Sequence, residues 1–415
     1  MPSETDLLRS LDDDPRTPST IDIHRAITSG KRRRARRSAG YAGAAAVTAV
    51  AVAGASVAGG VFTDDGASRN PAATPAKSAP AKAEPGAVAV APPNRCRLEK
   101  LPVPGDVSMA LVAGADPTGR YIVGRSYPKG GGYQAVIWHD GKGRNVAMPG
   151  DSEEQLTDVN SAGTAIGWSY DASGQVPYVY RDGKVSKLPG VKQAEPRGIN
   201  DAGAIVAGDG AELRDVLLWK SPTAQPTRLP LPAGATHAMA GDIDEDGTVV
   251  GTIDMRTPYV WLPDGSHHAL TLPTVNGKPL SRAGAFGIRN GWVTGTAGGG
   301  GLARGGAGTG KDKAQEPLVG VRWNLRTGEV QVVGELQDLA GAVNAQGWLV
   351  GSDKQGRAVL VAGDTPVLLP PLAKKKQTNV SNIPSTLSDD GRIVAGQSDD
   401  DDANDTIKAV VWHCS

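Results

Sequence analysis

The sequence predicts an all-β protein, a seven-bladed β-propeller of four-stranded blades, preceded by a single transmembrane helix and a linker rich in Pro and Ala. A turn glycine followed by a short apolar strand recurs seven times, at a spacing of about 44 residues, which is typical of a propeller blade. An apolar phrase that closes in Trp or Tyr follows six of the seven copies. Gly is abundant at 55 residues and aromatic residues are scarce, which favours tight turns and short strands.

Each repeat unit contains the pattern of four short strands. The turn glycines are Gly119, Gly163, Gly203, Gly247, Gly291, Gly347 and Gly391. The aromatic residues are Trp138, Tyr180, Trp219, Trp261, Trp323 and Trp412, and the sixth copy has 358–361 instead. A turn and a strand closing in Leu-Pro follow, and a strand ending in Asn or Asp precedes each glycine. A Gly-rich insertion at 298–310 lengthens the fifth unit. Such units are stable only when each covers its neighbour, as in a propeller.

The two ends of the repeat region complete each other. The seventh copy stops at Ser415 without its Leu-Pro strand, whereas 97–102 carries such a strand before the first copy. We therefore expect the N-terminal segment to supply the last strand of the seventh blade and close the ring. Cys96 and Cys414 would then flank the position of one tight turn, within about 7 Å of each other. They are the only cysteines, and we expect a disulfide between them, which a compartment outside the membrane permits.

The first hundred residues predict a membrane anchor. Residues 38–62 carry no charge, and a basic block at 31–37 precedes them. As a helix this run would be roughly 37 Å long, enough to cross about 30 Å of hydrocarbon. The basic flank favours a single-pass signal-anchor with residues 1–37 in the cytoplasm and the rest outside. Cleavage of a signal peptide after Ala53-Gly-Ala55 is the alternative, although the charged segment before the run is long for one.

Four segments follow from this organisation: a basic cytoplasmic tail (1–37), a transmembrane helix (38–62), a disordered linker (63–95) and the extracytoplasmic propeller (96–415). The linker is mostly Pro, Ala, Lys and Ser, a composition that cannot bury a core. The tail contains two short helix-start patterns, at Ser3 and Ser19. It is either a docking peptide for a cytosolic regulator or a disordered flank of the membrane span.

The repeat resembles the HAF-type repeats of bacterial extracellular proteins. The matching phrases are Ile199-Asn-Asp-Ala-Gly203, Val123-Gly124 and Ala135-Val-Ile-Trp138, within 96–415. The match is partial, because the His of that family is Gln134 in the first copy and Asp215 in the third. The resemblance implies a repeat fold in an exported protein and indicates little about ligand or chemistry.

One acidic phrase is a candidate calcium loop. Asp242, Asp244 and Asp246 occupy alternate positions before Gly247, as calcium ligands do. The loop lacks its final bidentate carboxylate, because Ile253 stands at that position. Equivalent slots in other copies hold Asn160 and Asn200, which favours the alternative that Asx residues here shape a turn. No other cofactor is indicated.

Two charged runs mark a candidate ligand rim. They are Lys374, Lys375 and Lys376, and Asp399, Asp400, Asp401 and Asp402. We expect both at one end of the propeller, where they either meet a ligand, are simply solvated, or neutralise each other. The rim itself is expected from the loops before each first strand and between the second and third strands, including 127–133, 169–176, 296–317, 374–386 and 397–407.

No catalytic motif is present. The six histidines show no triad or metal spacing. Gly305 to Lys311 resembles a phosphate loop but Asp312 follows the lysine instead of Ser or Thr. The net charge of zero indicates no nucleic-acid partner. The sequence therefore favours a non-enzymatic binding or scaffold module at the cell membrane, with an unknown extracytoplasmic protein or glycan as ligand. An envelope polysaccharide hydrolase or lyase and a transmembrane sensor are the alternatives.

Overall fold

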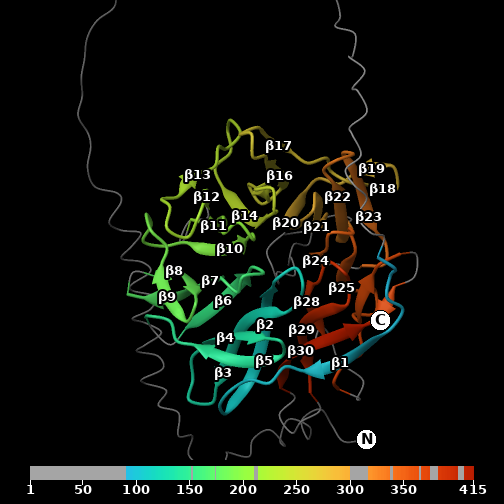
Figure 1. Cartoon of the computed structure of the whole chain (residues 1–415). Helices are drawn as coiled ribbons and strands as arrows, with labels where there is room; N and C mark the ends of the chain where they lie inside the picture. Colours follow the sequence, from blue (N-terminus) through green and yellow to red (C-terminus); the bar gives the residue numbers. More distant parts are fainter. Residues whose placement is uncertain are drawn as a thin grey trace, which may run out of the picture. The chain divides into compact units, whose positions relative to one another are not determined.

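The protein is a seven-bladed β-propeller, seen along its axis in Figure 1. The computed structural model describes residues 90–150, 153–172, 174–209, 214–299, 316–336, 340–363, 366–373, 382–400 and 406–415. Seven four-stranded antiparallel sheets surround the axis. Within each sheet, neighbouring strands are hydrogen-bonded in the order in which the next two paragraphs name them. The predicted number of blades and of strands per blade is therefore confirmed.

The first four blades follow one another along the chain. Blade 1 contains β2 (Val107–Ala115), β3 (Tyr121–Pro128), β4 (Gln134–His139) and β5 (Lys142–Val146). Blade 2 contains β6 (Glu154–Val159), β7 (Ala165–Asp171), β8 (Gly174–Arg181) and β9 (Lys184–Lys187). Blade 3 contains β10 (Glu195–Ile199), β11 (Ile205–Gly208), β12 (Val216–Trp219) and β13 (Thr227–Arg228). Blade 4 contains β14 (Ala238–Ile243), β15 (Val249–Ile253), β16 (Thr257–Trp261) and β17 (His267–Ala269).

The last three blades follow along the chain in the same way, except that blade 7 takes its fourth strand from the N-terminal end of the domain. Blade 5 contains β20 (Ala283–Arg289), β21 (Trp292–Ala297), β22 (Val319–Asn324) and β23 (Glu329–Val333). Blade 6 contains β24 (Ala340–Val343), β25 (Leu349–Ser352), β26 (Ala358–Val361) and β27 (Val367–Leu368). Blade 7 contains β28 (Ile383–Leu387), β29 (Ile393–Asp399), β30 (Ile407–Cys414) and β1 (Cys96–Lys100). A small hairpin of β18 (Thr274–Val275) and β19 (Lys278–Pro279), which the sequence analysis missed, lies between blades 4 and 5.

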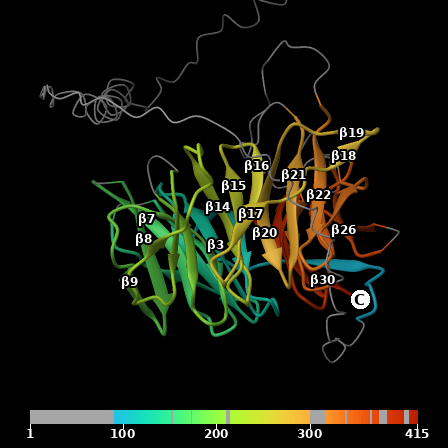
Figure 2. The ribbon, with the colours of Figure 1, turned by 90° about the horizontal axis from the view of Figure 1, so that it is seen from above.

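The two ends of the propeller carry different connections. Because the strands of a blade alternate in direction, the turns after the first and third strands share one end, which we call the turn face. The connections before the first strand and between the second and third share the other end, which we call the rim face. Figure 2 shows the blades from the side, with the β18–β19 hairpin at one end and the C-terminus at the other.

The predicted ring closure is confirmed by the pairing of β1 with β30. The strands are antiparallel, with Cys96 opposite Cys414 and Lys100 opposite Val410. Cys96 and Cys414 form a disulfide, with Cα atoms 4.0 Å apart. Backbone hydrogen bonds continue beyond the bridge, since Ser415 N donates to Arg95 O at 2.9 Å. The chain thus enters the propeller on the turn face.

Apolar side chains fill the spaces between adjacent blades. Val123 and Ile137 of blade 1 pack with Leu156 of blade 2, while Trp138 of blade 1 packs with Val411 of blade 7 on the other side. The repeat tryptophan also makes a polar contact with the preceding blade. Its indole N–H donates to a carbonyl oxygen just after the fourth strand of that blade. The pairs are Trp138 to Pro102, Trp219 to Pro189, Trp261 to Pro230, Trp323 to Thr271 and Trp412 to Pro370, at 2.7–3.0 Å.

The predicted membrane span, 38–62, lies outside the described residues, as do the cytoplasmic tail and nearly all of the linker. Within the described part of the chain, no helix is long and apolar enough to cross a membrane.

Removing the disulfide should destabilise the whole propeller. The bridge joins residues 318 positions apart, so it constrains a very long loop in the unfolded chain. We expect the double variant Cys96→Ser/Cys414→Ser to lose about 2–5 kcal/mol of unfolding free energy, measured by urea denaturation followed by tryptophan fluorescence. Dithiothreitol should produce the same loss in the wild type and none in the double variant. An unchanged midpoint would show that strand pairing alone closes the ring.

Candidate functional site

The central channel is lined by the first strand of every blade. Each of these strands carries a β-bulge close to its C-terminal end, and β2 has a second register shift between Val107 and Met109. Ahead of the bulge, partly exposed residues alternate with buried ones in several strands, as at Leu111 and Val112 or Met239 and Ala240. The buried residues pack between blades, so the partly exposed ones face the channel. A bulge turns the following side chains without breaking the sheet, and its recurrence in all seven blades makes the lining regular.

Charged side chains occupy this lining in blades 2, 3 and 4. Glu195 and Arg197 of blade 3 form an ion pair at 2.8 Å. Asp158 of blade 2 and Asp242 of blade 4 take the position directly after the bulge. Blades 1 and 3 have glycine there, and a Cβ at Gly114 would lie 2.8 Å from Asp158 Oδ1, while one at Gly198 would lie 2.2 Å from Asp242 Oδ1. Alternation of Gly and Asp therefore makes room for both carboxylates.

Both carboxylates bind backbone amides of the next blade. Asp158 Oδ2 accepts a hydrogen bond from Ile199 N at 2.9 Å. Asp242 accepts one from Ile243 N at 2.8 Å and one from Ile288 N at 3.1 Å. Burial raises the pKa of Asp242 to about 6. Burial also raises the pKa of Asp158 well above its ordinary value, and the charge of Asp242 raises it further. The channel thus holds two carboxylates that are reluctant to ionise together.

An arginine spans the end of the channel on the turn face. Arg289, at the end of β20, donates from Nε to both carboxylate oxygens of Asp389 at 3.1 Å, and from a terminal nitrogen to the same group at 2.7 Å. Its other terminal nitrogen donates to Glu245. The three residues come from blades 5, 7 and 4. Burial alone lowers the pKa of Arg289, but Asp389 and Glu245 outweigh it and raise the pKa above the ordinary value. The cluster therefore connects blades 4, 5 and 7 at this end of the channel.

The Asn or Asp before the turn glycine links neighbouring blades in blades 2, 3 and 4. Asn160 Nδ2 donates to Asn200 O, and Asn200 Nδ2 donates to Asp244 O, both at 3.1 Å. Asp244 continues the series by accepting from Asn290 N at 2.9 Å and Gly291 N at 2.7 Å. These side chains are buried, so each bond forms where water cannot compete. The repeated Ile-Asn phrase of the sequence is thus an inter-blade link as well as a turn former.

The three candidate calcium ligands do not point to one place. Asp242 faces the channel, Asp244 binds the amides of blade 5, and Asp246 Oδ1 accepts from Thr248 N at 2.8 Å within its own turn. Among the residues that the structure describes, no group of three or more His, Cys, Asp or Glu side chains is arranged to hold a metal ion. The turn-shaping alternative therefore describes the contacts of Asp244 and Asp246, and calcium binding stays a prediction.

The charged runs of the predicted rim are described only in part. Asp399 and Asp400 lie at the end of β29 on the rim face, and Asp400 forms an ion pair with Lys100 of the closing strand β1. Lys374, Lys375, Lys376, Asp401 and Asp402 lie outside the described residues. The sequence analysis did not single out Lys100, because its place beside Asp400 depends on the closure of the ring.

A stacked cluster on the rim face joins blades 1 and 2. The Arg125 guanidinium lies over the rings of Tyr127 and Tyr133, 5.5 and 4.9 Å from their centroids, and donates to Gln155 of blade 2. Tyr127 and Tyr133 also meet edge to face, at 4.8 Å between centroids. The predicted rim loop 127–133 thus contributes to a polar and aromatic surface. Arg125 itself was missed, because it lies inside the preceding strand.

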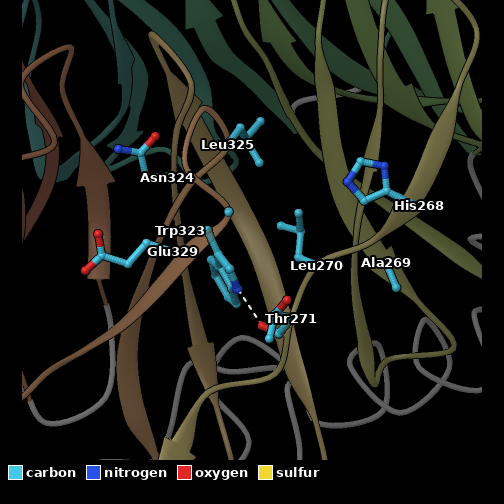
Figure 3. Close-up of a pocket in the computed structure, with 9 residues that line it drawn as sticks. His268, Ala269, Leu270, Thr271, Trp323, Asn324, Leu325 and Glu329 are labelled. Carbon is cyan, nitrogen blue, oxygen red and sulfur yellow. Dashed lines mark hydrogen bonds between the residues drawn. The ribbon is translucent and has the colours of Figure 1, made fainter. Parts of the chain in front are cut away.

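A small hollow opens between the outer strands of blades 4 and 5 (Figure 3). Trp323 and Leu270 form its wall, with His268 and Glu329 at its edge, and Trp323 Nε1 donates to Thr271 O at 2.7 Å. Its volume is about 90 Å³, well below the 300 Å³ or more of a site for a small organic ligand. Since this indole makes the same contact as the other repeat tryptophans, the hollow belongs to the packing between blades.

Comparison with known proteins supports the fold and leaves the function open. No family model matches the sequence, and no curated protein matches it. The chain is similar to a catalytically inactive virginiamycin B lyase from Staphylococcus aureus solved with quinupristin, with a TM-score of 0.50 and 12% identity over 77% of this chain and 99% of that one. It is also similar to YCF48 bound to D1 peptide (TM-score 0.46, 12% identity, 77% and 97% covered). A protein of unknown function from Bacteroides thetaiotaomicron is a third such structure (TM-score 0.41, 10% identity, 78% and 76% covered).

These identities are low, so the likeness concerns the propeller fold alone. The resemblance to HAF-type repeats stays a prediction.

The channel carboxylates should make stability depend on pH. Because the pKa of Asp242 is raised to about 6 in the folded chain, folding takes up protons between the ordinary carboxyl pKa and about pH 6. The stability is therefore greatest at the acid side of this window and falls as the pH rises through 6. We expect the melting temperature to rise by about 2–4 °C between pH 7.5 and pH 5. This shift should shrink in Asp242→Asn.

Asp264→Asn is the matched control. Ser266 lowers the pKa of Asp264, so this group titrates below the window, and the variant should keep the wild-type pH dependence. A melting temperature that falls on acidification in the wild type would contradict the assignment.

Proposed function

We propose that the protein is a single-pass membrane protein whose propeller is displayed outside the cytoplasmic membrane as a binding or scaffold module. Residues 38–62 anchor it, residues 1–37 lie in the cytoplasm, and 63–95 form the linker. A partner protein or glycan of the cell envelope binds the rim face and the channel mouth. The proposal includes no catalysis and no cofactor.

The observation that carries this proposal is the asymmetry of the two faces. The chain enters at Arg95 and Cys96 on the turn face, where Arg289 also spans the channel. The rim face carries the Arg125 cluster. A tether attached at the turn face leaves the rim face free for a partner.

Affinity capture tests the proposal most directly. We expect the full-length chain, immobilised through a C-terminal tag, to retain a specific envelope protein or glycan from a cell-envelope extract. Arg125→Ala should reduce the captured amount several-fold, because it removes a cation and the centre of the aromatic stack. Arg181→Gln, an exposed residue of the turn face, is the control and should capture as much as the wild type. Equal capture by the wild type and Arg125→Ala would place the binding surface elsewhere.

An envelope polysaccharide hydrolase or lyase is the second candidate, and the Asp158 and Asp242 pair favours it. Two neighbouring carboxyl groups, at least one with a raised pKa, are the usual acid and base of glycoside chemistry. Both, however, already accept hydrogen bonds from the backbone of the next blade. If the protein is an enzyme, purified chain should release reducing ends or unsaturated sugars from envelope polysaccharide, and Asp158→Asn and Asp242→Asn should each lose at least a hundredfold in rate. No product from the wild type would end this candidate.

A further inference from the structure

The hairpin between the second and third strands of blade 4 has an unusual tip. Asp254 and Met255 have φ angles of 49° and 52°, and Arg256 N donates to Ile253 O at 3.0 Å. Two residues in the left-handed region between paired strands form a type I′ turn. Such a turn strongly prefers Gly at its second central position, because a side chain there crowds the backbone. Met255 occupies that position.

Hydrogen bonds hold the first residue of this turn in place, and the second residue is exposed to solvent. The Asp254 carboxylate accepts hydrogen bonds from Thr236 N, Thr236 Oγ1 and His237 N, at 2.9–3.0 Å. The backbone bond of Thr236 is the largest of the effects that lower the pKa of Asp254, so the anchor is ionised at neutral pH. Met255 is 45% exposed, one of only three large apolar residues so exposed in the described part of the chain. The fold thus holds the backbone of this apolar residue in a strained conformation, with its side chain in solvent.

Two arginines beside this tip have no acidic partner among the residues that the structure describes. Arg256 follows Met255 and is exposed, and its carbonyl oxygen accepts from Ala283 N at 2.8 Å, which places Arg282 next to it. Arg282 Nε is buried and makes no hydrogen bond. Neither arginine forms an ion pair with any described residue. The guanidinium donors that lie at the surface therefore take their acceptors from solvent or from a partner.

Other cations of the rim face contrast with these two. Lys129 pairs with Asp106, Arg228 with Asp209 and Asp215, Arg197 with Glu195, and Lys100 with Asp400.

The nearby carboxylates are already engaged. Glu316 accepts from Ser281 N and Ser281 Oγ at 2.8–3.1 Å, and Asp254 is held by Thr236 and His237. The cluster of Met255, Arg256 and Arg282, which we call the blade 4 tip, therefore combines an apolar centre with two guanidinium groups that these carboxylates do not pair with. Arginine and methionine are both frequent at peptide-binding surfaces. A glycan would instead favour an aromatic platform, and this tip has none.

We propose that the blade 4 tip binds an acidic peptide segment of a partner protein, with carboxylates on Arg256 and Arg282 and an apolar side chain on Met255. This inference rests on the proposed function, because it names the ligand chemistry of one part of the rim face. The guanidinium groups offer bidentate geometry that fits a carboxylate. The backbone of Met255 is already fixed, so only its side chain must be ordered when the peptide arrives.

Fluorescence anisotropy with the full-length chain tests the site. The probe is a fluorescein-labelled peptide of alternating Glu and Leu, which should bind saturably, while a peptide of alternating Lys and Leu should not. The variant Arg256→Gln/Arg282→Gln should weaken binding at least tenfold, and Arg181→Gln should not change it. Met255→Gly should weaken binding at least threefold and at the same time raise the melting temperature by about 2 °C, because Gly removes the strain.

The two readouts of Met255→Gly separate a binding role from a structural one. Absence of saturable binding by the Glu and Leu peptide would overturn the proposal. So would a loss of affinity in Arg181→Gln equal to the loss in Arg256→Gln/Arg282→Gln. Binding of polygalacturonate that depends on the two arginines and not on Met255 would replace the peptide by an anionic glycan. If the substitutions of Arg256, Arg282 and Met255 leave the capture of an envelope partner unchanged, the blade 4 tip is not the binding site. The proposed function would then still stand.

Discussion

The pairing of β1 with β30 is the constraint on which the rest of the molecule depends. Every other blade is formed by strands consecutive in sequence, whereas blade 7 joins segments from the two ends of the domain. Each blade covers the face of the next, so an open end would expose the apolar side chains that now pack between blades 7 and 1. The disulfide lies at the first pair of this ladder, at the place where the chain enters the propeller. Tension on the preceding segment therefore meets the hydrogen bonds of Asn94 and Arg95 with Ser415 and then a covalent bond, before it reaches the rest of the ladder.

Closure also creates the channel and its electrostatics. Asp158 and Asp242 approach each other only because seven bulged strands are held around one axis, and Arg289 reaches blade 7 only in a closed ring. Burying these carboxylates costs stability when they ionise, although the backbone amides that bind them offset part of the cost. Each carboxylate also connects its blade to the next. The propeller thus uses the same groups for assembly and for the charge of its interior. The rim face, at the other end from the entry of the chain, keeps its surface for binding.

The sequence was sufficient for the architecture and insufficient for the site. Turn glycines such as Gly203 and aromatic residues such as Trp138 act within one blade or between adjacent ones, so their spacing predicted the blades, the closure and the disulfide. Arg289 and Asp389 are 100 residues apart, and no local pattern connects them. The role of Asp158 depends on the bulge and on the absence of a side chain at Gly114. The β18–β19 hairpin was missed although its Asn276-Gly277 turn is a strong hairpin signal.

Native-state hydrogen exchange measures most directly whether closure holds the entire ring together. The comparison is between the wild type and a chain in which Leu98 and Lys100 of β1 are replaced by proline, which removes donors and prevents pairing with β30. We predict that amides in β10 and β14, on blades remote from the closure, lose protection together with those in β29 and β30. Loss confined to blade 7, with blades 3 and 4 as protected as in the wild type, would contradict the account, because the blades would then be stable without the ring.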